Sequence, residues 1–94
     1  MKLSKDILKY VVEFLGTLFF ISAILLSKGN AFVIGAALAV AILLGGKVSG
    51  GHFNPAVSFM FYVNNQLLKQ EFIVYIVGQI LGAILALFLF KQLY

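Results

Sequence analysis

Three long apolar runs constrain this chain more than any other feature of its sequence. They occupy residues 7–26, 31–46 and 72–90, and Glu13 interrupts the first. Runs of about this length are typical of helices that cross a lipid bilayer. A soluble domain of 94 residues could not bury its apolar side chains if 63% of its residues were hydrophobic, as they are here. We therefore expect an all-α membrane protein in which residues 1–94 form a single unit.

A polar, glycine-rich break at residues 50–57 interrupts this pattern. It lies within a segment, residues 49–62, that differs from the three long runs. Asn54 followed by Pro55 is typical of a helix start, with Asn as the N-cap and Pro in the first helical position. The residues that follow, 56–62, are apolar but too few to cross a bilayer. The pattern predicts a re-entrant loop and a half-helix that starts at mid-depth. A bilayer tolerates such backbone only beside protein or a water-filled cavity, so the segment indicates a permeation path.

The charged residues argue against several other classes of protein. The formal net charge is +4, and the lysines are spread along the chain, so nucleic-acid binding is not expected. Three acidic residues and one histidine form neither a paired-acid site nor a metal-ligand cluster, and no nucleophile accompanies His52. We therefore expect no enzymatic activity, no cofactor and no metal. The absence of cysteine excludes disulfides and thiol chemistry.

Small residues recur at every fourth position in the second and third runs. Such rows allow helices to approach one another closely in lipid. The short polar turn at residues 27–30 also predicts that the second span is an antiparallel neighbour of the first. The rows are Ala31, Gly35 and Ala39; Ala37, Ala41 and Gly45; and Gly78, Gly82 and Ala86.

The lysines predict a cytoplasmic N-terminus. Three spans place the two termini on opposite sides of the membrane, and the positive-inside rule assigns the lysine-rich side to the cytoplasm. Five lysines fall on the N-terminal side and two on the other: Lys2, Lys5, Lys9, Lys47 and Lys69 against Lys28 and Lys91. A signal peptide is the alternative for the first run. It is disfavoured because the run is long, contains an acid and precedes no clear cleavage site.

Three segments together resemble a known family. Residues 49–58, Ser-Gly-Gly-His-Phe-Asn-Pro-Ala-Val-Ser, resemble the first signature loop of the aquaporin and glycerol-facilitator family, the major intrinsic proteins. Residues 13–17, Glu-Phe-Leu-Gly-Thr, are similar to its first-span motif, and residues 78–83, Gly-Gln-Ile-Leu-Gly-Ala, to its third-span motif. The resemblance implies a half-aquaporin: three transmembrane helices plus one re-entrant half-helix, a single inverted-repeat unit.

The chain also departs from the family pattern. The family's full chain has two inverted halves and two Asn-Pro-Ala loops, whereas this sequence has one such loop. Val57 follows Ala56, as in the family's first half; the second half usually carries an arginine there. No arginine occurs in this chain.

The resemblance implies a role for each residue of the loop. Asn54, Pro55 and Ala56 form the pore motif, in which the Asn54 amide donates to a passing oxygen in addition to capping the helix. The positive ends of two half-helix dipoles would oppose cations and protons while admitting neutral solutes. The loop carbonyls would line the path, from residues Gly50, Gly51, His52 and Phe53. His52 is either a hydrogen-bonded structural residue, which we favour, or a pH-dependent gate.

Further residues are implied outside the loop. Glu13 either snorkels to the interface and pairs with Lys9, or, as the family suggests, accepts hydrogen bonds from the loop's buried N–H groups. Gln79 is implied as a second polar anchor. Ile34, placed 20 positions before Asn54, and Val57 would form an apolar selectivity ring. That ring predicts a permissive pore for water, glycerol-like polyols and ammonia.

Three spans and one half-helix cannot enclose the family's channel. A second half is therefore expected from an antiparallel copy of this chain or from a separately encoded half, and several pores would form a higher oligomer. The lysine distribution opposes the antiparallel copy. A truncated fragment, or a small non-conducting membrane protein with a structural or regulatory role, stays open as the alternative.

Overall fold

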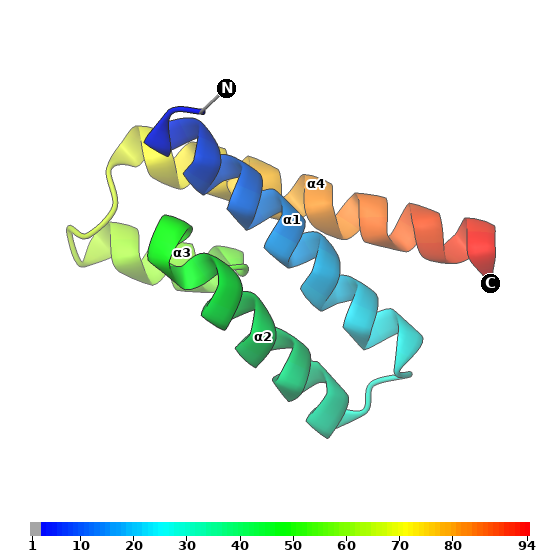
Figure 1. The fold of residues 1–94 in the computed structure, drawn as a ribbon. Coiled ribbons are helices and arrows are strands. Elements are labelled where there is room, and N and C mark those ends of the chain that lie inside the picture. The colour runs from blue at the N-terminus through cyan, green and yellow to red at the C-terminus, as the bar shows by residue number, and fades with distance from the viewer. Residues whose placement is uncertain (1–2) are drawn as a thin grey trace.

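The computed structural model describes residues 3–94, which form four α-helices (Figure 1). They are α1 (Lys5–Leu26), α2 (Ala31–Ser49), α3 (Pro55–Val63) and α4 (Lys69–Leu93). No strand is present within this range. α1, α2 and α4 are each long and apolar enough to cross a membrane, whereas α3 has nine residues. The predicted all-α architecture, three long helices plus one short helix, is confirmed.

All three long helices extend beyond the apolar runs that predicted them, and α2 and α4 do so at ends with defined hydrogen bonds. α2 continues past Lys47 to Ser49 and ends at Gly50, whose φ of 90° is left-handed and whose N–H donates to the Gly46 carbonyl. α4 begins at Lys69, where the Glu71 carboxylate accepts a hydrogen bond from Leu68 N at 3.0 Å. Both extensions contain polar residues and end in hydrogen bonds that satisfy a helix end, which an apolar-run criterion does not detect.

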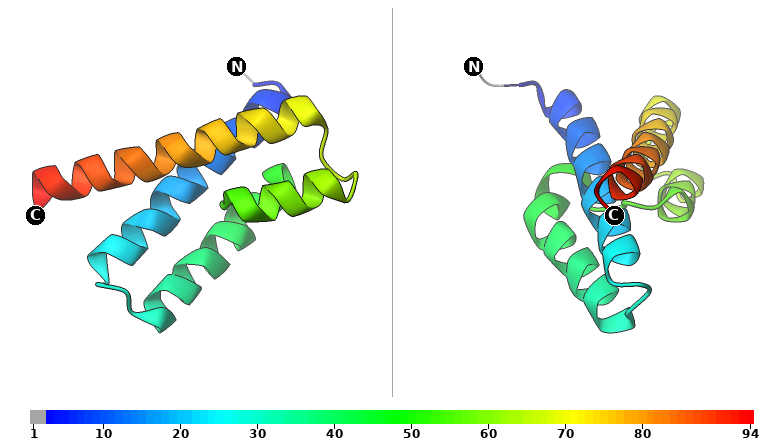
Figure 2. Two further views of the ribbon diagram at one scale, coloured as in Figure 1. Left: turned by 180° about the vertical axis from the view of Figure 1, so that it is seen from behind. Right: turned by 90° about the vertical axis from the view of Figure 1, so that its right-hand side faces the viewer.

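α1 lies between α2 and α4 and packs against both, while α3 packs against α4 (Figure 2). Two of the three small-residue rows make these contacts. Ala37, Ala41 and Gly45 are buried on the α1-facing side of α2, and a Cβ at Gly82 would lie 2.7 Å from the Phe14 carbonyl oxygen. The row that contains Gly35 is exposed, with nothing within 4 Å of a Cβ built at that glycine.

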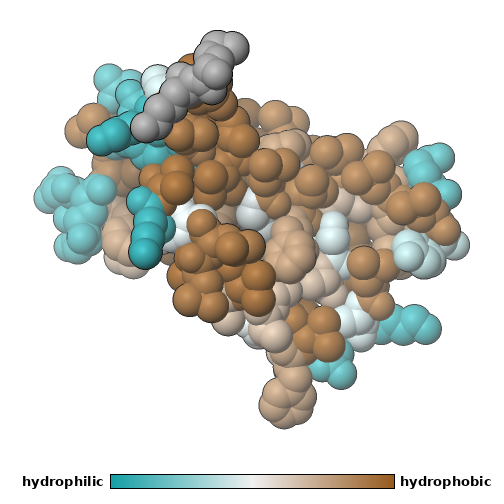
Figure 3. Space-filling view, viewed as in Figure 1, coloured by the Kyte–Doolittle hydropathy of each residue, from teal (hydrophilic) through white to brown (hydrophobic). Residues whose placement is uncertain are grey.

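The polarity of the protein is the reverse of that of a soluble domain. Side chains such as Phe32, Leu43 and Leu44 are 78–89% exposed, and the space-filling view is apolar over its middle and hydrophilic toward its ends (Figure 3). Among residues 3–94, six polar or charged residues are buried: Glu13, Thr17, Ser49, His52, Ser58 and Gln79. An apolar exterior around a polar interior suits a bilayer, where lipid tails replace water as the solvent.

The start of α3 lies near the middle of the bundle. Phe53, the residue before Asn54, contacts Gly16, which is the twelfth of the 22 residues of α1. α3 therefore starts halfway along a spanning helix. The start of α1 and the end of α4 lie at opposite ends of the molecule (Figure 1). Lys2, one of the lysines in the orientation argument, lies outside the described residues.

Candidate functional site

Asn54 starts α3 and leaves one end of its amide uncommitted to the cap. Its Oδ1 accepts a hydrogen bond from Ala56 N at 2.8 Å, and Pro55 occupies the first helical turn. Asn54, Pro55 and Ala56 are all exposed. The Nδ2 group, which donates hydrogen bonds, is thus the part of the side chain that the cap does not use. The structure presents a helix N-terminus and an amide donor together at an open face.

The backbone of the loop depends on left-handed residues. Gly50 and Gly51 have φ values of 90° and 66°, and Phe53 has a φ of 52°. A Cβ at Gly51 would lie 3.4 Å from Gly46 Cα, so this position is both conformationally and spatially restricted. Phe53 adopts a conformation that costs a non-glycine residue about 1–2 kcal/mol. Burial of its ring, which is 2% exposed, offsets that strain.

Glu13 supports the loop through hydrogen bonds from the loop backbone. The residue is fully buried and its carboxylate accepts hydrogen bonds from four donors. Oε2 accepts from Ser49 Oγ at 2.7 Å and from His52 N at 3.0 Å. Oε1 accepts from Phe53 N at 2.8 Å and from Gln79 Nε2 at 2.9 Å. This is the arrangement that the loop-supporting interpretation requires, in which the buried charge is matched by hydrogen bonds.

Lys9 is not the partner of Glu13. Its Nζ lies 2.6 Å from Glu71 Oε2 and 3.2 Å from Asp6 Oδ1. The interpretation of Glu13 as a snorkelling carboxylate paired with Lys9 is therefore wrong for this structure. The Lys9–Glu71 pair instead joins the first turns of α1 and α4.

Gln79 and Ser58 extend the network toward His52. Gln79 Nε2 donates to both Glu13 Oε1 and Ser58 Oγ, each at 2.9 Å. Ser58 Oγ lies 2.8 Å from His52 Nδ1. Ser58 Oγ accepts from Gln79 and has one proton and one further lone pair, so it can either donate to Nδ1 or accept from it, depending on the tautomer of His52.

The His52 ring lies in a structured environment. It stacks on Phe61 with ring centroids 4.5 Å apart and meets the edge of Tyr75 at 5.1 Å. Burial lowers the pKa of the imidazole below its ordinary 6.5, and the Glu13 charge opposes that shift. A polar cavity of about 290 Å³ adjoins the ring and is also bordered by the Lys9–Glu71 pair. The contacts suit the hydrogen-bonded structural histidine of the two interpretations.

The ring of Phe53 is inserted between α1 and α2. A Cβ at Gly16 would overlap this ring, and a Cβ at Gly45 would lie 3.3 Å from Phe53 Cζ. The two glycines therefore form a socket for the ring. The socket fixes the residue that immediately precedes Asn54.

Ile34 and Val57 do not meet within the chain. Ile34 is half-buried in the first turn of α2, and Val57 is half-buried in the first turn of α3. Among residues 3–94, α2 and α3 do not pack against each other. A selectivity ring that contains both residues needs further walls.

Four residues in or beside the hydrogen-bond network were missed as functional candidates in the sequence analysis. Ser49 and Ser58 flank the loop, and Tyr75 donates a 2.7 Å hydrogen bond to the Ser49 carbonyl. Thr17 is buried beside α4. Tyr75 lies one helical turn before Gln79, and Thr17 lies one turn after Glu13. One-turn spacing from a buried polar residue in an apolar helix is the signal that would have found these two.

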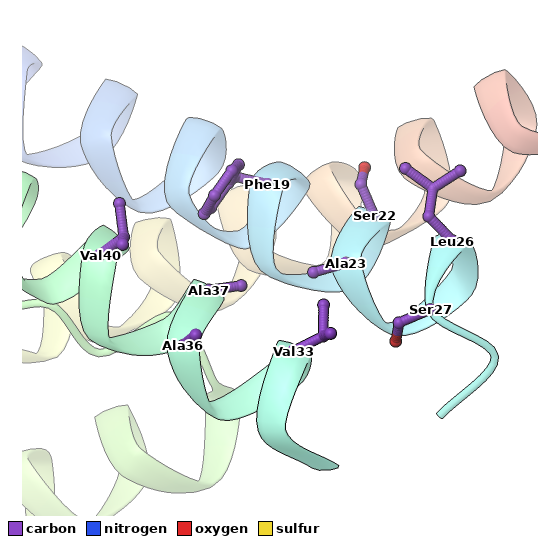
Figure 4. A pocket seen from close by; sticks show the side chains of 9 residues that line it. All are labelled: Phe19, Ser22, Ala23, Leu26, Ser27, Val33, Ala36, Ala37 and Val40. Atoms are coloured by element: carbon purple, nitrogen blue, oxygen red, sulfur yellow. The ribbon is translucent and has the colours of Figure 1, made fainter. Parts of the chain in front are cut away.

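Two apolar grooves run along the helices that surround the loop. One, of about 580 Å³, lies between α1 and α2 toward their connecting turn (Figure 4), and its lining residues are Phe19, Ser22, Ala23, Leu26, Ser27, Val33, Ala36, Ala37 and Val40. Another, of about 490 Å³, lies between α3 and α4 and includes Pro55 and Ala56. Both grooves are open to the surroundings of the chain.

Comparison with known proteins shows several relatives of this chain. It is 40% identical over 86 residues to glycerol uptake facilitator protein-like 6 of Lactiplantibacillus plantarum. The matched region covers 83% of this chain and 40% of that relative. It is 36% identical to aquaporin TIP2-1 of Arabidopsis thaliana, over 87% of this chain and 40% of the relative. It is 37% identical to the lens fiber major intrinsic protein of Lithobates pipiens, over 77% of this chain and 32% of the relative.

These relatives are longer than the chain, which spans at most 40% of the length of each of the three. No solved structure matches the chain. The family model described as Major intrinsic protein matches residues 1–94. The chain therefore belongs to the major intrinsic protein family and is an integral membrane protein.

Proposed function

We propose that this chain is one half of a transmembrane channel for passive permeation of water and small neutral solutes. The observation that carries the proposal is the exposed start of α3, held at the middle of the bundle by a fully buried carboxylate. A membrane protein gains nothing from an exposed amide at this depth unless a wet path or another polypeptide faces it. The names of the relatives, a glycerol uptake facilitator-like protein and an aquaporin, support the solute class.

In this proposal the loop supplies the polar lining of the path. Asn54 donates from Nδ2, and the carbonyls of Gly50, Gly51, His52 and Phe53 accept hydrogen bonds from solute in single file. The dipole of α3 adds a positive end at the same point and opposes cations. None of these groups performs covalent chemistry, which fits a channel and not an enzyme.

Ile34 and Val57 form the apolar part of the selectivity ring. Neither side chain can donate or accept a hydrogen bond, so the ring does not restrict permeation to water. The proposed solutes are water, glycerol-like polyols and ammonia. Strict water selectivity in a vesicle swelling assay would contradict this assignment.

The second half comes from another polypeptide. The exposed tip of α3 carries polar groups that lipid tails cannot satisfy, and the open grooves along α1–α2 and α3–α4 offer space for further helices beside it. Either an antiparallel copy of this chain or a separately encoded half fits that requirement. The lysine distribution favours a cytoplasmic N-terminus in every copy, and hence the separate half. Several completed pores would then associate into a higher oligomer.

The deciding experiment reconstitutes the purified chain in liposomes and applies an osmotic step. Fast shrinkage with the chain alone supports a self-assembled pore. Shrinkage only with an added second half supports the split channel. No response with any pairing contradicts the channel and supports the alternative, a non-conducting membrane protein or channel fragment. The orientation of both termini in cells separates the two pairings, because self-pairing requires mixed orientation.

Asn54→Asp and Gly51→Leu test the site itself. Aspartate also caps helices well, so the fold should be retained while a negative charge replaces the amide donor. Gly51→Leu places a side chain at a left-handed position 3.4 Å from α2 backbone. Loss of permeation in Asn54→Asp, with normal insertion, supports the pore role. Unchanged permeation in that variant contradicts it.

A further inference from the structure

Two buried polar atoms near the loop support have no hydrogen-bond partner within residues 3–94. They are Thr17 Oγ1 and Gln79 Oε1. Thr17 is 3% exposed and Gln79 is 1% exposed, so bulk solvent does not reach either residue. Buried polar atoms in native proteins are nearly always paired with protein or with an ordered water molecule. Two unpaired atoms in one region therefore require an explanation.

The two residues lie on the same seam between α1 and α4. Gln79 donates to Glu13, and Thr17 follows Glu13 by one helical turn on the same face of α1. On α4, Gly82 lies three positions after Gln79, and a Cβ at Gly82 would be 3.3 Å from Thr17 Cβ. Residues three or four apart are neighbours on a helix surface. Thr17 and Gln79 are therefore adjacent across the seam.

The Thr17 hydroxyl is also not used by its own helix. A threonine or serine inside a helix often donates to the carbonyl four residues earlier. Ser22, on the same helix, does so, with Oγ 2.6 Å from the Leu18 carbonyl oxygen. Thr17 Oγ1 makes no such bond among the described residues. Its side chain faces α4, so its donor is available to the seam.

We propose that one water molecule is bound between Thr17 Oγ1 and Gln79 Oε1. The two atoms are chemically complementary, because the hydroxyl donates and the amide oxygen only accepts. A single water accepts from Thr17 and donates to Gln79, and two polar partners suffice for a buried water. The amide of Gln79 is not reversed, since that would turn its oxygen toward the Glu13 carboxylate.

The bound water makes Thr17 a positioning residue for the loop. With Oε1 held by the water, Nε2 of Gln79 remains directed at Glu13 Oε1 and Ser58 Oγ. Glu13 in turn holds the backbone N–H groups of His52 and Phe53. The inference concerns the folded chain and does not depend on which solute permeates.

The test compares Thr17→Val, which keeps the shape and removes the hydroxyl, with Thr17→Ser, which keeps the hydroxyl. The full chain in lipid is used, and two measurements are made. The first is a structure that resolves ordered waters. We expect water density within hydrogen-bond distance of both atoms in the wild type, and none at that point in Thr17→Val.

The second measurement is amide hydrogen exchange at His52 and Phe53. We expect exchange roughly tenfold faster in Thr17→Val, as loss of a buried hydrogen bond implies, and near wild-type exchange in Thr17→Ser. Ser22→Ala is the matched control, because it removes an α1 hydroxyl that bonds only to its own helix. A direct Thr17–Gln79 hydrogen bond, or no density between them, overturns the proposal. Equal exchange in the two Thr17 variants overturns it as well. Failure of Thr17→Val to fold leaves the wild-type structure as the decisive measurement.

Discussion

The ring of Phe53 occupies the space that a side chain at Gly16 would fill. Phe53 comes from the loop and Gly16 from the middle of α1, so this contact joins the segment before Asn54 to a spanning helix. The fit depends on the lack of a Cβ at Gly16. The depth of the loop in the bundle is thus set by a size relationship between two residues far apart in sequence.

Gly16→Ala should destabilise the chain and displace the loop. The added methyl overlaps the Phe53 ring, and overpacking of this kind costs about 1–3 kcal/mol. We expect a lower melting temperature in detergent and reduced permeation. Phe53→Leu in the same chain should recover part of both losses, because the smaller side chain makes room for the methyl.

Gly35→Ala is the control for that substitution. It adds the same methyl to a spanning helix at a site with nothing within 4 Å. The stability and the permeation of the Gly35→Ala variant should match those of the wild type. Equal losses in the Gly16 and Gly35 variants would show that the Phe53 contact is not responsible, because alanine favours a helix more than glycine does.

Glu13→Gln should weaken the support of the loop severely. The carboxylate accepts four hydrogen bonds, whereas an amide accepts at only one end and directs its own N–H groups at donors. We expect a loss of about 1.5–3 kcal/mol for each charge-assisted hydrogen bond that the amide cannot accept. Thermal unfolding measures it. Asp6→Asn, on the same helix but with a side chain 74% exposed, should change stability little.

Lys9→Met should have a small, salt-dependent effect. The Lys9–Glu71 pair is partly exposed, with side chains 26% and 18% accessible, so solvent screens part of the attraction. We expect a loss of up to about 1 kcal/mol at low salt and less at high salt. Melting curves of wild type and variant at two ionic strengths would show this. A large loss that salt does not change would instead indicate a structural role for the Lys9 side chain.

Acidification should destabilise the chain through His52. Burial lowers the pKa of this loop imidazole in the folded protein, so the unfolded state binds a proton more readily than the folded state. Stability is therefore highest above about pH 6.5 and falls as the pH decreases toward the folded pKa. Melting temperatures across this range provide the measurement. In His52→Gln the slope should flatten; a slope that persists would assign the titration to another group.

Much of the fold could be predicted because a bilayer requires long apolar helices, and these leave clear local signals in the sequence. Apolar runs of spanning length, the Asn54-Pro55 start and the four-residue turn are local signals, and each corresponds to a feature of the structure. The helix ends at Ser49 and Lys69 were less predictable, because polar residues continue both helices beyond the apolar runs.

The partners of the loop were harder to predict, since they depend on tertiary contacts. The family motif pointed to Glu13 and Gln79, but not to the Ser49 and Ser58 hydroxyls between them. The Phe53 socket was also missed, because the sequence shows Gly45 only as a member of a small-residue row and Gly16 only as part of the first-span motif, with no occupant for either. Small-residue rows show that something approaches closely and do not say what.

The donors around Glu13 carry a consequence for biosynthesis. α1 is synthesised first, yet one of its carboxylate's donors, Gln79, arrives with α4, 66 residues later. Until the loop and α4 follow, the Glu13 carboxylate has to stay in contact with water or with the insertion machinery, because lipid tails offer it no hydrogen-bond donor. The first helix therefore settles into its final place only when the last one has been delivered.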